Sequence, residues 1–146
     1  MSYKEVENFY ELVQDVSVDV NATDPLNRMN ALLKLSRNYG HNDLIELVQP
    51  LLVRGIDVNA KDPNGWNALH NLCRYYEHES LIDLIQLLEK SNIDLQTKTN
   101  EGYTALHLLA FENSANFSSK QIVIEILSKE GDLLEVAKVR TYHAIY

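Results

Sequence analysis

The stretch Gly65-Trp66-Asn67-Ala68-Leu69-His70-Asn71-Leu72 decides how the rest of the chain is interpreted. It returns as Gly102-Tyr103-Thr104-Ala105-Leu106-His107-Leu108-Leu109, so that His107 follows His70 by 37 residues. A further step of 37 residues toward the N-terminus reaches Met29-Asn30-Ala31-Leu32-Leu33. A return at a nearly fixed distance indicates one structural unit that is repeated along the chain. Repeat arrays of this kind form extended surfaces more often than active sites.

The composition restricts the classes of protein to which the chain can belong. Apolar residues make up 45% of the 146 residues, which is enough for a continuous core. The formal net charge is −8, from 21 acidic and 13 basic residues, and we therefore expect neither nucleic acid nor an anionic membrane surface as a partner. The single cysteine, Cys73, excludes an internal disulfide and favours a reducing, intracellular compartment, cytoplasmic or nuclear.

Apolar residues recur at helical spacing in paired segments. Residues 3–15 have one apolar stripe, and each later copy contains a short helix followed by a more apolar one. Faces as dense as Leu81-Ile82-Asp83-Leu84-Ile85 cannot be covered within one short helix pair and need neighbouring units. We predict an all-α helical solenoid of stacked helix-turn-helix units with hairpin-like turns. The expected first helices span about residues 30–38, 67–75 and 104–112, and the expected second helices about 42–53, 80–90 and 119–129.

Polar connections lead into the first helices, and they are rich in the Asn, Asp and Pro that are typical of tight turns. The connections are Val18-Asp19-Val20-Asn21-Ala22-Thr23-Asp24-Pro25, Ile56-Asp57-Val58-Asn59-Ala60-Lys61-Asp62-Pro63 and, more loosely, Ile93-Asp94-Leu95-Gln96-Thr97-Lys98-Thr99-Asn100. Gly65 and Gly102 end two of the turns. Arg28 holds the glycine position in the first copy, 37 residues before Gly65, whereas the connection before it precedes its second copy by 38 residues. We therefore predict one extra residue near Leu26-Asn27 that reshapes this turn.

Both ends of the chain resemble incomplete units. Residues 3–15 align with a second helix, and Thr141-Tyr142-His143-Ala144-Ile145-Tyr146 aligns with the start of a first helix. We expect one repeat domain over residues 1–146, cut from a longer array. Its expected parts are a partial unit at 1–17, repeats at 18–55, 56–92 and 93–131, and the start of a truncated fourth repeat at 132–146.

This organisation resembles the ankyrin repeat, a unit of about 33 residues with the word Thr-Pro-Leu-His-x-Ala. The matching words are Thr104-Ala105-Leu106-His107, Asn67-Ala68-Leu69-His70, Gly40-His41 and Gly55-Ile56-Asp57-Val58-Asn59-Ala60. Units of about 37 residues and Leu33 in place of the histidine depart from the family pattern. The resemblance implies an interaction module that binds another protein through the concave face of the array.

The resemblance also indicates which residues face the concave side. After the turn, the copies have Met29, Trp66, Tyr103 and Tyr142, and Trp and Tyr are enriched at interface hot spots. Such a row of large side chains would cross successive units; the alternative is that the aromatic residues only pack between units. The other candidate contact residues are Arg37, Asn38, Arg74, Tyr75, Phe111 and Glu112 at the helix ends and Pro63, Asn64, Asn100 and Glu101 at the turn tips.

Two constellations invite a chemical role. His70 and His107 lie in adjacent units, about 10 Å apart if the helices pack side by side, whereas zinc ligands lie about 2 Å from the metal. We expect each imidazole to bond a neighbouring turn, as in the family, and predict no metal site. Cys73 follows His70 by three residues, but nothing orients the histidine as a base. We expect a buried thiol and predict no catalytic residues, cofactor or small-molecule substrate.

Three hypotheses follow for the function. In the first, the chain is a binding module, and its acidic charge favours a partner protein with a basic patch. In the second, the chain is a regulatory fragment of a larger multidomain protein, or a short inhibitor that resembles the ankyrin regulators of Rel-type transcription factors. In the third, an enzyme uses Cys73 and His70. We favour the binding module and predict that the chain is not an enzyme.

Overall fold

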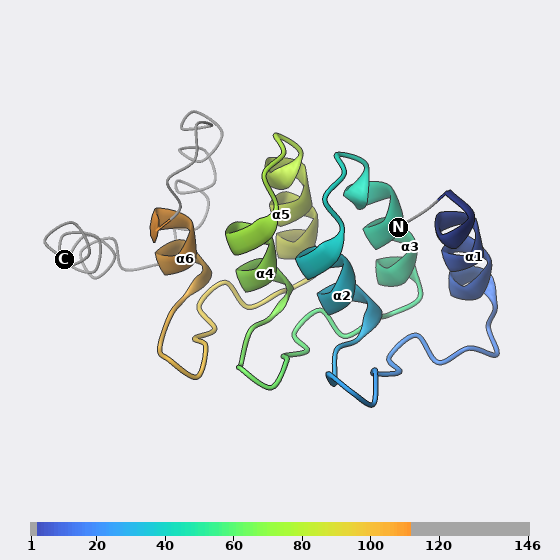
Figure 1. Cartoon of the computed structure of the whole chain (residues 1–146), viewed down its shortest axis with the longest axis horizontal. Helices are drawn as coiled ribbons and strands as arrows, with labels where there is room; N and C mark the ends of the chain where they lie inside the picture. Colours follow the sequence, from blue (N-terminus) through green and yellow to red (C-terminus); the bar gives the residue numbers. More distant parts are fainter. Residues whose placement is uncertain (1–2, 112–146) are drawn as a thin grey trace, which may run out of the picture.

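The structure, a computed structural model, describes residues 3–111 and, among these, the side chains of residues 8, 9 and 11–109. This part of the chain is helical and contains no strand, as predicted (Figure 1). The helices alternate between two rows, with α2, α4 and α6 in one and α1, α3 and α5 in the other. Their bounds are α1 Tyr3–Gln14, α2 Ala31–Asn38, α3 Leu44–Val53, α4 Ala68–Tyr75, α5 Leu81–Lys90 and α6 Ala105–Phe111.

The observed helices match the predicted ones closely within the described residues. The helix expected at 67–75 is α4, which begins at Ala68, and the helix expected at 80–90 is α5, which begins at Leu81. The second helix expected at 119–129 and the further unit expected at 132–146 lie outside the described residues. None of the helices in residues 3–111 is long and apolar enough to cross a membrane.

Asparagine side chains start the first helices α2 and α4. Asn30 precedes α2, and its side-chain oxygen accepts a hydrogen bond from the Leu33 amide at 2.9 Å. Asn67 precedes α4 and accepts from the His70 amide, also at 2.9 Å. An N-cap of this kind satisfies one of the backbone donors that the first helical turn leaves without an intrahelical partner.

The second helices end where one residue adopts a left-handed backbone conformation. Gly55 has φ +83° after α3, and Asn92 has φ +68° after α5. The amide of Ile56 then donates to the carbonyl of Leu51 at 3.1 Å, which is the bond that closes a Schellman motif. This turn directs the chain away from the second helix and into the next connection.

The core lies between the two rows and is shared between units. Leu47 and Leu51 of α3 and Leu84 and Ile85 of α5 are each at most 1% exposed. First helices also pack on one another, α2 against α4 and α4 against α6, while α3 packs on α2 and α5 on α4. Burial of each apolar face therefore depends on the neighbouring unit, as predicted for a solenoid.

Three fingers, residues 19–29, 57–66 and 94–103, extend to the same side of the helices (Figure 1). The second finger closes with hydrogen bonds from Gly65 N to Asp62 O, at 2.9 Å, and from Asp62 N to Trp66 O, at 2.9 Å. The first closes one residue later, with a bond from Arg28 N to Asp24 O at 2.7 Å. The extra residue predicted in the first turn is therefore confirmed.

Two asparagines join successive fingers through backbone groups. The side-chain oxygen of Asn21 accepts from the Asp57 amide at 2.7 Å. Asn59 repeats the arrangement one unit on: its oxygen accepts from the Asp94 amide at 2.8 Å, and its nitrogen donates to the Asn92 carbonyl at 3.2 Å. These bonds set the spacing between units and satisfy peptide groups that have no partner within their own finger.

Candidate functional site

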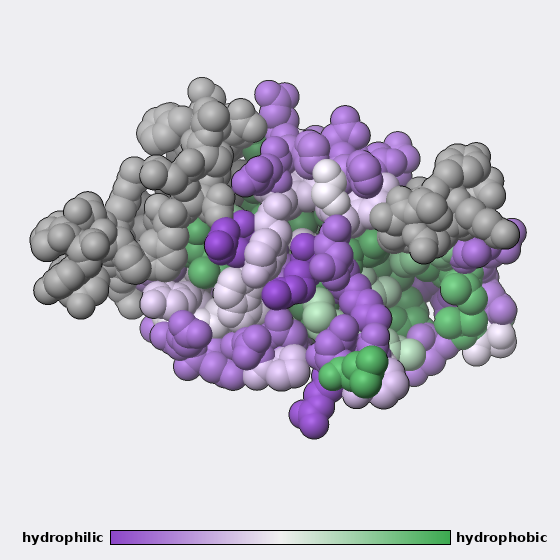
Figure 2. All heavy atoms as spheres, viewed as in Figure 1, coloured by the Kyte–Doolittle hydropathy of each residue, from purple (hydrophilic) through white to green (hydrophobic). Residues whose placement is uncertain are grey.

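The candidate site lies on the first-helix face, which we define as the surface formed by α2, α4, α6 and the three fingers (Figure 1). In the view of Figure 2, side chains in the middle of the molecule are mainly hydrophilic, whereas hydrophobic side chains gather near α1. Most residues predicted to contact a partner lie on the first-helix face.

The indole of Trp66 lies along α4, the helix that follows it. Its amide donates to the Asp62 carboxylate at 3.0 Å, which fixes the backbone from which the indole extends. The ring centroid is 6.2 Å from that of His70 and 6.1 Å from that of Tyr75, with 31° between the planes of Trp66 and Tyr75. The indole is only half-buried, so one side packs on α4 while the rest is available to solvent.

Two arginines share the ring of Tyr75. The guanidinium carbon of Arg37, in the last turn of α2, lies 5.0 Å from the ring centroid. That of Arg74, in the last turn of α4, lies 5.4 Å from it. Both arginines are exposed, and Tyr75 is 42% exposed. The four side chains of Arg37, Trp66, Arg74 and Tyr75, called here the arginine–aromatic cluster, thus come together from two adjacent units, which sequence spacing alone does not reveal.

The predicted residues at the finger tips are exposed and hold one another in place. Asn100 donates from its side chain to the Pro63 carbonyl at 2.9 Å and from its amide to the Asn64 carbonyl at 3.0 Å. Pro63, Asn64, Asn100 and Glu101 are all exposed, and so is Asn38 at the end of α2. The second and third tips therefore form one connected edge of the first-helix face.

The row of large side chains is interrupted at its first member. Met29 is buried, with 6% of its surface exposed, whereas Trp66 and Tyr103 are half-buried. The longer first finger explains the difference: the Met29 amide bonds to the Asn27 side chain at 3.0 Å instead of to the carboxylate at the finger base. Met29 was predicted as a contact residue, but its burial leaves it little surface with which to contact a partner.

Three of the predicted contact residues cannot be placed on the first-helix face. The Phe111 side chain, Glu112 and Tyr142 lie outside the described part of the chain. Tyr103 is described, and its ring centroid lies 6.1 Å from that of His107. Trp66 and Tyr103 thus have the same relation to the histidine four residues later.

His70 joins two units through its two ring nitrogens. Nδ1 accepts from the Asn67 amide at 3.1 Å, and Nε2 lies 3.1 Å from the Tyr103 carbonyl oxygen. Because an amide must donate to Nδ1, the neutral ring carries its proton on Nε2 and donates to Tyr103. The predicted bond from this imidazole to the neighbouring turn is confirmed. His107 accepts in the same way from the Thr104 amide, at 3.0 Å.

Burial keeps His70 neutral. The ring is 1% exposed, and loss of solvation is the main cause that lowers its pKa, against smaller opposing contributions from backbone hydrogen bonds. Both nitrogens already have hydrogen-bond partners. Within residues 3–111, no group of three or more His, Cys, Asp or Glu side chains is placed to hold a metal ion.

Cys73 is a buried thiol. Only 2% of its surface is exposed, within the core cluster that includes Leu69 and Leu72. His70 uses its Nδ1 and Nε2 in the backbone bonds described above, so neither nitrogen is directed at the thiol. The arrangement therefore gives no geometric support for a Cys–His nucleophile.

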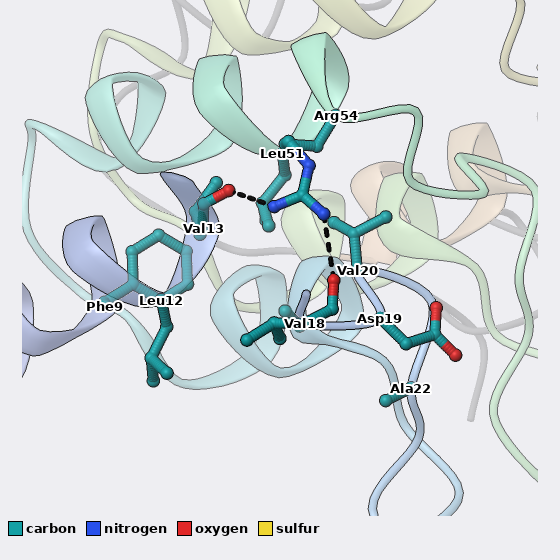
Figure 3. Close-up of a pocket in the computed structure, with 10 residues that line it drawn as sticks. Phe9, Leu12, Val13, Val18, Asp19, Val20, Ala22, Leu51 and Arg54 are labelled. Carbon is teal, nitrogen blue, oxygen red and sulfur yellow. Dashed lines mark hydrogen bonds between the residues drawn. The ribbon is translucent and has the colours of Figure 1, made fainter. Parts of the chain in front are cut away.

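An apolar cavity of about 220 Å³ lies beside α1 and was not predicted (Figure 3). It lies between α1, α3 and the first finger, with Phe9, Leu12 and Leu51 among its lining residues. At its edge Arg54 donates to the carbonyls of Val13 and Val18, the latter at 2.9 Å (Figure 3). The arginine thus caps the C-terminal end of α1.

The sequence did contain a signal for this cavity. Phe9 and Leu12 align, at a distance of 75 residues, with Leu84 and Leu87 of α5. Leu84 is fully buried, whereas Phe9 is half-buried and Leu12 is 55% exposed. Within the described residues, α1 thus occupies the place of a second helix without a first helix beside it.

Comparison with known families agrees with this geometry. The family described as ankyrin repeats (3 copies) matches residues 32–135. The chain therefore belongs to the ankyrin-repeat family, whose members are in general non-enzymatic modules for protein–protein interaction. A search of curated proteins found no match for the chain.

Proposed function

We propose that the chain binds a partner protein through its first-helix face, the concave side of the ankyrin array. The arginine–aromatic cluster is the observation that carries the proposal. The rings of Trp66 and Tyr75 lie beside one another with centroids 6.1 Å apart and planes tilted by 31°, and both keep exposed surface. Large aromatic side chains that are held in place before binding lose little conformational entropy when a partner covers them.

The finger tips enlarge the same surface. The bonds from Asn100 to Pro63 and Asn64 hold two tips together, so the tips and the cluster form one extended contact area. An extended, preformed surface of this kind suits a protein better than a small molecule, which binds in an enclosed pocket. The buried Cys73 fits a reducing compartment, the cytoplasm or the nucleus.

The test compares two double variants of the full chain. Trp66→Ala with Tyr75→Ala removes the aromatic part of the cluster. Val16→Ala with Val53→Ala truncates two side chains that are each 87% exposed and lie outside the first-helix face, and it serves as the control. Affinity purification with quantitative mass spectrometry should show loss of the partner only in the first variant. Equal capture by both folded variants would contradict the proposed face.

A further inference from the structure

The first helices have a charge opposite to that of the whole chain. The net charge is −8, yet α2, α4 and α6 contain no Asp or Glu. They carry Arg37, Arg74 and Lys34, and the ammonium of Lys34 pairs with the Asp24 carboxylate of the first finger. By contrast, the second helices contain acidic residues: α3 has Glu46, and α5 has Asp83 and Glu89. The three fingers are each net acidic, so the positive charge that a partner meets is confined to the last turns of α2 and α4, where Arg37 and Arg74 lie. A basic patch on the partner, as the net charge alone suggested, does not fit these two turns.

The two arginines of the cluster are held close to one another. The guanidinium carbons lie 5.0 and 5.4 Å from the same ring centroid, so the two carbons are at most about 10 Å apart. Like charges at this distance repel, and the face of the tyrosine ring offsets this repulsion by attracting both cations. An anion between them would remove the repulsion and add charge-assisted hydrogen bonds.

Placement at helix ends does not by itself explain this arrangement. Cations in the last turn do interact favourably with the helix dipole. However, both guanidiniums lie over the ring of Tyr75, which is the residue after Arg74 and belongs to the unit after that of Arg37. The residue of α6 that is equivalent to Arg74 is Phe111, and the residue of α2 that is equivalent to Tyr75 is Asn38. Among the described units, the combination of two cations and a tyrosine is thus specific to the junction between α2 and α4.

We propose that this junction receives an acidic peptide segment of the partner protein. Two carboxylates bind the guanidiniums of Arg37 and Arg74, and an apolar side chain between or beside them packs on Tyr75 and Trp66. In an extended peptide, residues two or three apart are about 7–10 Å from one another, which lies within the upper limit on the distance between the two guanidinium carbons. The inference rests on the proposed function and names the partner chemistry at the same face.

The experiment pans a displayed library of random dodecamer peptides on the full chain and measures affinities of the selected peptides by fluorescence polarisation. Selected peptides should carry Asp or Glu pairs two or three residues apart, next to an apolar residue. The variant Arg37→Gln with Arg74→Gln should weaken their binding by roughly tenfold or more. The affinity should also fall as ionic strength rises from about 0.05 to about 0.5 M.

Controls separate charge, geometry and folding. Lys61→Gln with Lys90→Gln removes the same charge from two exposed lysines outside the cluster and should leave binding unchanged. Arg37→Lys with Arg74→Lys keeps the charge but loses the planar fork, so binding should fall only in part. Thermal melts establish that each variant is folded.

Three results would overturn the inference: selected peptides without an acidic preference, no selection at all, or equal binding by the glutamine variant. If peptide binding is lost in the Trp66→Ala, Tyr75→Ala variant but not in the glutamine variant, the face still binds and only the acidic chemistry is wrong. If neither variant affects binding, the proposed face is wrong as well.

Discussion

The first and second fingers have related sequences but differ in structure. The second finger has Gly65 at φ +79° and keeps Trp66 partly exposed on the first-helix face. The first finger is one residue longer, has Arg28 at φ +59°, and buries Met29. One inserted residue thus changes both the hydrogen bonds of the turn and the side chain that the turn presents.

The difference shows how local backbone chemistry controls the binding surface. In the second unit, His70 bonds both its own helix start and the Tyr103 carbonyl of the next finger. In the first unit Leu33 holds the histidine position, and the link to the next unit comes instead from the Asn30 side chain to the Asp57 carbonyl at 3.3 Å. The two junctions therefore use different side chains, and only the second has a histidine that joins a helix start to the next finger.

The largest effect is expected at Gly65. A Cβ there would lie 2.6 Å from the side-chain oxygen of Asn100 and 2.9 Å from its backbone nitrogen. Gly65→Ala combines this collision with a left-handed backbone and should lower the free energy of unfolding by about 2–4 kcal/mol. Chemical denaturation monitored by circular dichroism measures the change.

Gly102→Ala is the matched control for the collision. Its φ is +89°, but nothing lies within 4 Å of an added Cβ. Only the backbone strain remains, and the loss should be about 1–2 kcal/mol. Equal losses in the two variants would show that contact between the second and third tips contributes nothing.

Replacing His70 by the leucine of the first unit should have the next largest effect. His70→Leu leaves the Asn67 amide and the Tyr103 carbonyl without their imidazole partner in a buried place, which should cost about 2 kcal/mol. Hydrogen exchange should show faster opening of the second and third fingers. His41→Leu, which changes an exposed histidine, is the control, and an unchanged stability of His70→Leu would refute the bridging role.

The pH dependence of stability should come partly from the same histidine. Because burial lowers the pKa of His70, the unfolded chain takes up a proton at this side chain more readily than the folded chain. Stability from this group is therefore complete above the unfolded pKa, about 6.5, and is lost as pH falls below it, by at most about 1.4 kcal/mol per pH unit. Urea titrations of the wild type and of His70→Leu at pH 7.0 and pH 5.5 test this prediction. An equal loss of unfolding free energy between the two pH values in both proteins would contradict it.

The smallest effect is a gain of stability in the first finger. Arg28→Gly gives the first finger the residue that the second has at this place, and relief of the left-handed strain should stabilise the fold by about 0.5 kcal/mol. Arg28→Ala is the control, because it removes the side chain and keeps the strain. A gain in both variants would point to the arginine side chain instead of the backbone.

The sequence predicted the repeat, the helices and the histidine bonds because these depend on local patterns that recur at a fixed spacing. The bonds between His70 and Asn67 lie within one helix start, whereas the bond from His70 to the next finger was expected from the resemblance to the family. The extra residue near Leu26-Asn27 was visible as a change of offset.

Features that depend on side-chain direction were not predictable. The sharing of Tyr75 by Arg37 and Arg74 needs the relative position of two helices, which spacing does not give. Burial of Met29 was missed because the alignment with Trp66 ignored the altered turn before it. The cavity beside α1 was missed although the alignment of Phe9 and Leu12 with α5 marked α1 as a second helix, because its lining also comes from α3 and the first finger.

The asparagine bonds between fingers have a consequence for how such arrays can grow. The Asn59 side chain recognises only peptide groups, the carbonyl of Asn92 at the end of its own unit and the amide of Asp94 in the following unit, and every amino acid but proline offers both groups. A duplicated unit would therefore meet the same docking groups as the original, whatever its outward-facing residues. The hydrogen bonds between units therefore survive duplication of a unit, and the outward-facing residues of each copy can then diverge toward new partners.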